Sequence, residues 1–210
     1  QLWRALAAKV DVDGKLVENP YKKWSDIDVS LPNKKIEILI AQPTSGTRDA
    51  WNSLVMNEGC SKAAKSLFGD KAKKECVKMR EDGYAVEAGE NDTLIVQKLS
   101  ANPDAYGFFG YSYLLANKDK IKAAAVNGVK PSLEGIQDYS YPIARPLFFY
   151  VKKAHVGVVP GLKEFLAEFT SQKAMGSRGY LTDIGLVPLA SDKYKITRTA
   201  AKDLVTITLK

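Results

Sequence analysis

The sequence contains one short motif whose side chains are suited to binding a small anion. Beginning at residue 42, it reads Gln-Pro-Thr-Ser-Gly-Thr-Arg-Asp. Ser45 and Thr47 supply hydroxyl donors, and Arg48 supplies a guanidinium that can form two parallel hydrogen bonds to an oxyanion. Gly46 lets the backbone approach a bound group closely, and Asp49 is the only acidic residue of the motif. This set of donors fits a tetrahedral oxyanion, whose oxygens are hydrogen-bond acceptors.

The flanking sequence places the motif at a turn from a strand into a helix. Apolar side chains alternate at period two over residues 36–40 and recur at three and four over residues 50–56. Pro43 ends the strand, and Thr44 or Ser45 can cap the helix with its hydroxyl. The first amides of a helix have no internal partners and carry the positive end of its dipole, so they attract anions. The simpler alternative is that Ser-Gly-Thr serves only as a helix cap.

The motif favours binding over catalysis. No Lys follows Gly46 in the way that a nucleotide P-loop requires. The only histidine, His155, lies more than a hundred residues from Ser45, so no neighbouring base is present to activate that hydroxyl. One histidine and two cysteines do not make a zinc site. We therefore expect neither an enzyme nor a bound metal or cofactor.

Composition describes an ordinary globular chain. Its 210 residues are 45% hydrophobic and 26% charged, with a net charge of +7. The lysines of residues 62–78 and 118–130 are not interleaved with aromatic side chains, so we interpret them as solvated helix faces and expect no nucleic-acid partner. No apolar run approaches the eighteen or so residues that a membrane span needs.

Cys60 and Cys76 leave two alternatives open, a pair of buried thiols or a local disulfide. The even count, the short separation and the polar surroundings favour the disulfide, which forms in an oxidising compartment. The chain would then be exported. Residues 1–7 resemble an amphipathic helix rather than a leader, so we expect that a leader was removed or that the chain begins inside a larger protein.

Strand and helix patterns alternate along the chain, which predicts α/β architecture. Residues 85–88 look extended, and a helix opened by Asn91 and Asp92 follows, with Leu94, Ile95 and Leu99 on its apolar face. Further predictions are an aromatic strand at 106–111, a hairpin at 121–130 turning at Asn127-Gly128, an apolar strand at 147–151, and a helix from Pro160 with Leu162, Phe165, Leu166 and Phe169 on one face.

Several stretches, taken in order, resemble the periplasmic phosphate-binding proteins of bacterial high-affinity phosphate ABC transporters. The stretches that carry the resemblance are residues 19–27, 45–49, 89–92, 107–111, 141–147 and 179–181. The likeness implies an α/β fold of the type II periplasmic-binding-protein class, with two lobes around a ligand cleft. Residues 1–142 would form the second lobe, which carries the Ser-Gly-Thr-Arg-Asp anion site, and residues 143–210 the C-terminal part of the first. A first-lobe segment of about a hundred residues would be missing from this chain and would be its partner.

The resemblance also implies roles for individual residues. Ser45 and Thr47 would donate hydroxyl and amide hydrogens to phosphate, and Gly46 would donate its amide. Arg48 would replace an arginine that many relatives carry shortly before Ser-Gly-Thr, and Asp49 would orient Arg48.

The implied function is capture of inorganic phosphate outside the cytoplasm and its delivery to the permease subunits of an ABC transporter. Asn91 would contact the ligand from a second helix start, while Tyr141 and Arg145 would flank the crossing between lobes.

The alternatives are a receptor for sulfate, molybdate or tungstate and, less favoured, a phosphatase-like enzyme or acyl transferase using Ser45. A carboxylate acceptor would mark a phosphate site, because only a protonated anion can donate to it.

Overall fold

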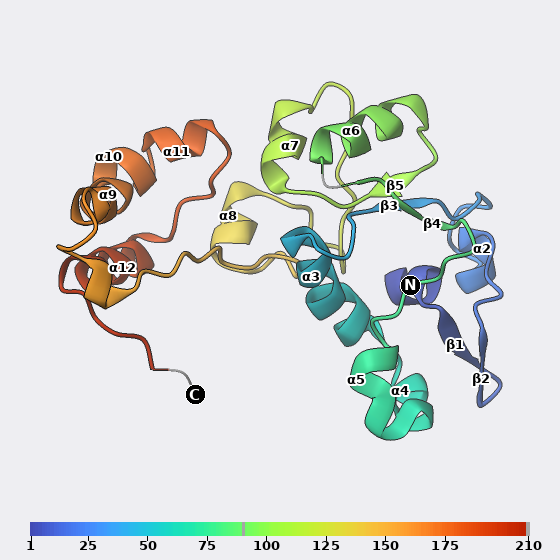
Figure 1. The fold of residues 1–210 in the computed structure, drawn as a ribbon. Coiled ribbons are helices and arrows are strands. Elements are labelled where there is room, and N and C mark those ends of the chain that lie inside the picture. The colour runs from blue at the N-terminus through green and yellow to red at the C-terminus, as the bar shows by residue number, and fades with distance from the viewer. Residues whose placement is uncertain (90, 209–210) are drawn as a thin grey trace. The chain divides into compact units, whose positions relative to one another are not determined.

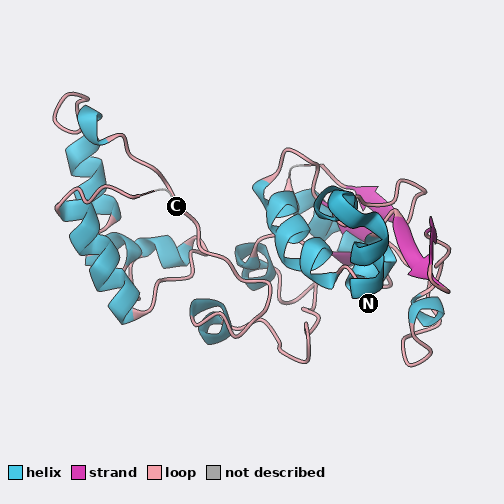
Figure 2. Ribbon diagram, turned by 90° about the horizontal axis from the view of Figure 1, so that it is seen from below, coloured by secondary structure: helices cyan, strands magenta, loops and turns pink. Residues whose placement is uncertain are grey.

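A computed structural model describes residues 1–89 and 91–208. Contacts divide the chain into two compact units, Gln1–Lys122 and Ala123–Lys210 (Figure 1). The strands, drawn in magenta in Figure 2, all belong to the first unit in the part of the chain that the structure describes. The lobe boundary expected after residue 142 stays a prediction. No helix among the described residues is long and apolar enough to cross a membrane.

The first unit alternates strands with helices, in agreement with the predicted α/β architecture. Its elements, with 3-10 and π segments marked η, are α1 (Leu2–Leu6), β1 (Lys9–Val12), β2 (Lys15–Glu18), α2 (Trp24–Ile27), β3 (Ile38–Ile40), α3 (Gly46–Trp51), η1 (Asn52–Asn57), α4 (Lys62–Phe68), η2 (Gly69–Lys71), α5 (Ala72–Glu75), β4 (Ala85–Glu87), α6 (Asp92–Ala101), β5 (Tyr106–Gly107) and α7 (Tyr111–Ala116).

The sheet that positions the motif has the order β4-β3-β5, and β3 runs parallel to both neighbours. Ile38 lies beside Ala85 on one side and beside Tyr106 on the other. The carboxyl ends of the strands therefore meet at one edge. The aromatic strand predicted at 106–111 is shorter than expected, because Gly110 caps α7 and the chain turns into that helix at Tyr111.

Alternating side chains of β3 enter different cores on the two faces of this sheet. Ile38 and Ile40 pack into the larger cluster with Trp3 and Met56, whereas Leu39 packs with Ile95 of α6. Figure 1 accordingly shows α6 on one side of the sheet and α1 and α3 on the other.

The apolar face predicted for α6 needs one correction. Ile95 is fully buried and Leu99 packs against the same cluster. Leu94, however, is 45% exposed, and Val96 is buried in its place. The reason is geometric, since the face toward the sheet is centred one residue further along the helix than the Leu94–Ile95–Leu99 pattern indicates.

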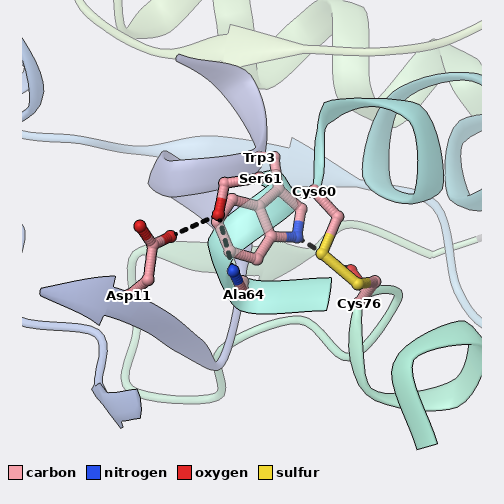
Figure 3. Close-up of a disulfide and its surroundings, with 6 residues drawn as sticks. All are labelled: Trp3, Asp11, Cys60, Ser61, Ala64 and Cys76. Carbon is pink, nitrogen blue, oxygen red and sulfur yellow. Dashed lines mark hydrogen bonds between the residues drawn. A yellow bond between two sulfur atoms is a disulfide. The ribbon is translucent and has the colours of Figure 1, made fainter. Parts of the chain in front are cut away.

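Cys60 and Cys76 form the predicted disulfide (Figure 3). Both half-cystines are buried, and so is the neighbouring Trp3. The Trp3 indole N–H donates to the carbonyl of Cys76 at 3.0 Å. Ser61 caps α4 by accepting from the amide of Ala64. The bridge thus ties the corner between η1 and α4 to the segment that packs on α1.

The second unit is helical in its described part. Its elements are α8 (Leu133–Gln137), η3 (Lys153–His155), α9 (Leu162–Phe169), α10 (Gln172–Met175), α11 (Tyr180–Asp183) and α12 (Ser191–Lys202). The hairpin predicted at 121–130 is reduced to one bridge between Val126 and Val129. Its turn is placed as expected, with Asn127 and Gly128 at positive φ of 50° and 79°.

The prediction of a strand at 147–151 was wrong. These residues are irregular, and within the described residues no strand of this unit is available to pair with them. Phe149 contacts α9, with its ring centroid 5.9 Å from that of Phe165 and 4.7 Å from that of Phe169, while Phe148 and Tyr150 stack on each other at 6.4 Å. On that helix Leu166 is buried while Phe165 stays 50% exposed. High strand propensity therefore did not produce a strand without a partner.

Candidate anion-binding site

Helix starts gather at the carboxyl edge of the β4-β3-β5 sheet. Ser45 caps α3 shortly after β3, Asn91 caps α6 after β4, and Gly110 caps α7 after β5. Parallel sheets of this kind bind ligands outside the carboxyl ends of their strands. The donor motif predicted from sequence therefore lies at the edge where such a sheet offers a site.

Ser45 shows the local geometry that the sequence predicted. Its side chain accepts a hydrogen bond from the amide of Thr47 at 3.1 Å, which is an N-cap bond. The hydroxyl hydrogen of Ser45 is a separate donor, because the cap uses only the oxygen as acceptor. Ser45 and Thr47 are partly exposed, and Gly46 and Asp49 are exposed. The cap and the anion interpretation of this motif are thus compatible.

Arg48 is buried, with 9% of its surface exposed, although it carries a full charge. Its Nη1 donates to the carbonyl of Ala41 at 2.8 Å and lies 3.8 Å from Oε1 of Glu87. Its Nε is buried with no hydrogen-bond partner among the described residues. Burial lowers the pKa of Arg48, and Glu87 partly opposes that shift. The guanidinium thus lies at the ends of β3 and β4, held by the carbonyl of Ala41 and the carboxylate of Glu87.

Glu87 is the residue of this arrangement that the sequence reading missed. It is the last residue of β4 and lies beside Ile40 in the parallel register, so its side chain reaches Arg48 from the neighbouring strand. In the sequence, Glu87 could be noticed only as a carboxylate near the end of the extended segment 85–88. Its contact with Arg48 could be recognised only once the pairing of β3 with β4 was known.

Asn91 acts as a helix cap in the structure, because its side chain accepts from the amide of Thr93 at 2.9 Å. The next residue, Asp92, accepts from the amide of Gly110 at 3.2 Å and so ties the start of α6 to the start of α7. Ligand contact by Asn91 stays a prediction. Glu90, which belongs to the motif recognised at 89–92, lies outside the described residues.

Tyr141 and Arg145 belong to the second unit. Burial raises the pKa of the Tyr141 phenol.

Among the residues that the structure describes, no group of three or more His, Cys, Asp or Glu side chains could hold a metal ion. A shallow pocket of about 500 Å³ lies elsewhere in the first unit, beside β1, β2, α4 and α5, and none of the predicted site residues lines it.

Comparisons with known proteins agree with this architecture. A sequence model of a PBP superfamily domain matches residues 1–173. Protein SphX of Synechococcus elongatus is 31% identical over 192 residues, covering 86% of this chain and 48% of that protein. The phosphate-binding protein PstS of Staphylococcus haemolyticus is 28% identical over 186 residues, covering 86% and 50% respectively. The chain therefore spans about half the length of the curated relatives it matches.

A solved structure shows the same fold. The crystal structure of a possible phosphate binding protein from Planctomyces limnophilus superposes with a TM-score of 0.62 at 23% sequence identity, covering 98% of this chain and 63% of that one. This likeness confirms the predicted α/β fold of the type II periplasmic-binding class. Because the domain model matches well over half of the sequence, the chain belongs to the PBP superfamily.

Proposed function

We propose that the protein carrying this chain is an extracytoplasmic solute-binding protein for inorganic phosphate. In this proposal it binds phosphate at the start of α3, catalyses no reaction and delivers its ligand to an ABC permease. The observation that carries the proposal is the position of Ser45, Gly46, Thr47 and Arg48 at the carboxyl edge of a parallel sheet. A helix start offers amides and a positive dipole end, and these side chains add hydroxyl and guanidinium donors.

The relatives support the choice of ligand. Matched proteins of several staphylococci carry the name phosphate-binding protein PstS. The disulfide supports a location in an oxidising compartment such as the periplasm. Asp49 and Asn91 complete the proposed ligand-contacting set from the first turn of α3 and the cap of α6.

Calorimetric titration with sodium phosphate tests the proposal. Ser45→Ala removes one hydroxyl donor to a charged ligand, which costs about 1.5–3 kcal/mol, or roughly ten- to a hundredfold in affinity. The matched control is Ser171→Ala, which removes the same kind of helix cap from α10 in the second unit. Ser171→Ala should bind phosphate like the wild type. Measured on the full-length protein, equal affinities for the wild type and Ser45→Ala would reject the α3 start as the site, and no binding by the wild type would reject phosphate as its ligand.

A further inference from the structure

Residues 61–78, which contain α4 and α5, concentrate positive charge on one small part of the first unit. This stretch, called the lysine segment below, holds six lysines and two carboxylates in a chain whose net charge is +7. Five of the six are exposed, and the sixth is partly exposed. The lysines are Lys62, Lys65, Lys71, Lys73, Lys74 and Lys78.

Most of this charge is not neutralised within the protein. The ammonium group of Lys78 lies 2.8 Å from Oε1 of Glu75. Within the described part of the chain, the other five lysines form no ion pair with a carboxylate. The second carboxylate, that of Asp70, is exposed on η2. The segment therefore presents a positively charged surface to solvent.

Apolar side chains lie among these lysines. Leu67 is 44% exposed at the end of α4, and the next residue, Phe68, is partly exposed. With Leu16 of β2 they form the apolar lining of the shallow pocket of about 500 Å³. The rest of that lining is charged and consists of Lys9, Asp70, Lys71 and Glu75. A surface that combines lysines with exposed apolar groups can contact lipid headgroups and the upper part of the acyl chains together.

The lysine segment lies apart from the candidate anion site. Ser45 begins α3 at the edge of the sheet, and α3 and η1 lead from there to α4 and α5 (Figure 1). The disulfide joins Cys60, which directly precedes the segment, to Cys76 near its end. The segment is thus held as a closed loop, and contact with a large surface there leaves the start of α3 uncovered.

The residue types of the lysine segment favour a lipid surface over a protein partner. Protein interfaces are enriched in Arg, Tyr and Trp and depleted in Lys. The segment contains none of the three enriched types. Attraction of lysines to an anionic bilayer, in contrast, needs no directional bonds and contributes roughly fivefold in affinity for each lysine near the surface.

We propose that the lysine segment is a membrane-contact surface, which binds bilayers that contain anionic phospholipids. Its lysines contact the phosphate groups of the lipid headgroups, and Leu67 and Phe68 lie at the boundary of the acyl chains. This role goes beyond the proposed function, because it needs no ligand at the start of α3. It would keep a solute-binding protein close to a membrane surface.

Co-sedimentation with vesicles tests the proposal on the full-length protein, prepared without lipid modification. The wild type should bind vesicles in which about a third of the lipid is phosphatidylglycerol and should not bind vesicles of phosphatidylcholine alone. Added salt should release it, because salt screens exposed charges. The triple variant Lys71→Gln, Lys73→Gln, Lys74→Gln should lose on the order of a hundredfold in affinity for the anionic vesicles.

A second triple variant controls for net charge. Lys118→Gln, Lys120→Gln, Lys122→Gln removes three exposed lysines from another part of the same unit. It should bind the anionic vesicles within about threefold of the wild type, because these lysines lie outside the lysine segment. Phosphate calorimetry on the same variants reports separately on the start of α3.

Four outcomes would overturn the proposal. A wild type that binds neither kind of vesicle has no membrane-contact surface, and equal binding to both kinds would exclude the lysines as its cause. Equal losses in the two triple variants would show an effect of net charge alone. Binding to immobilised polyglutamate without binding to anionic vesicles would assign the surface to an acidic protein. None of these results bears on phosphate binding, which the calorimetry decides.

Discussion

The burial of Arg48 is unfavourable for folding by itself. A guanidinium taken out of water needs hydrogen bonds for its donors. Among the described residues, Arg48 has one bond to a carbonyl and a carboxylate at 3.8 Å, while its Nε has no hydrogen-bond partner. Such under-satisfied charges are expected where a ligand completes the set. In the proposed function, bound phosphate would accept hydrogen bonds from this guanidinium.

Replacement of Arg48 tests this explanation. Arg48→Ala should weaken phosphate binding by about 2–4 kcal/mol, because a desolvated charge contact is lost. The free energy of unfolding should fall by less than that, since the variant no longer buries an under-satisfied cation. The phosphate affinity of Arg48→Lys should lie between those of the wild type and Arg48→Ala, because lysine keeps the charge but lacks the planar fork of donors. Calorimetry and urea unfolding measure the two quantities, and unchanged phosphate affinity in Arg48→Ala would remove Arg48 from the site.

Sequence reasoning at the residue scale succeeded where the signal was local. The caps at Ser45 and Asn91 follow from side chains that bond to amides two residues away. The pairing of Glu87 with Arg48 depends on the register between β3 and β4, which local sequence does not encode. The helix caps of the candidate site were therefore predictable from the sequence, and the contact across strands was not.

At the scale of elements, the segment after α5 is joined to the corner between η1 and α4 by the disulfide and to the first helix by hydrogen bonds. The amide of Arg80 donates to the carbonyl of Leu6 at 2.8 Å, and that of Ala8 donates to the carbonyl of Lys78 at 2.9 Å. Trp3 adds its bond to Cys76. The bridge thus closes a local loop, whereas these hydrogen bonds connect elements that are distant in the sequence. Residues 147–151 have no such partner among the described residues. They therefore do not form the strand that the sequence predicted, because a strand needs a neighbour to pair with.

Loss of the bridge should destabilise the first unit without changing ligand binding. The Cys60→Ala, Cys76→Ala double variant should lose about 3 kcal/mol of unfolding free energy, as expected for a loop of this length. Phosphate affinity of the folded variant should stay within about twofold, because Cys60 follows the far end of the helical segment that Ser45 begins. Urea titration and calorimetry provide the measurements. Alkylation of both thiols in unreduced native protein would instead show that the bridge is absent.

At the scale of the whole chain, the second unit exposes an apolar surface. Leu147, Phe148 and Tyr150 are 79%, 71% and 77% exposed, and Phe165 is 50% exposed. Apolar side chains gathered in this way favour association, because contact removes them from water.

We therefore expect the 210-residue chain to self-associate in a concentration-dependent manner. The double variant Phe148→Ser, Tyr150→Ser should shift the population toward monomer in sedimentation velocity experiments. Val29→Ser is the matched control, since Val29 is 94% exposed in a loop of the first unit and should have no such effect. A monomeric wild type at all concentrations tested would contradict this expectation.

The strand order β4-β3-β5 also has a consequence for how the chain acquires its structure. The central strand is the first of these strands in the sequence, and Ile38 acquires its second neighbour only at Tyr106. A chain that emerges from its N-terminus therefore carries an unpaired central strand until most of the first unit has appeared. Both cysteines lie between the first and second strands to emerge, so their bridge can close before any pairing in this sheet is possible. Sheets built from such distant pairings assemble slowly. Oxidation of the cysteines should accordingly precede completion of the edge at which the anion is proposed to bind.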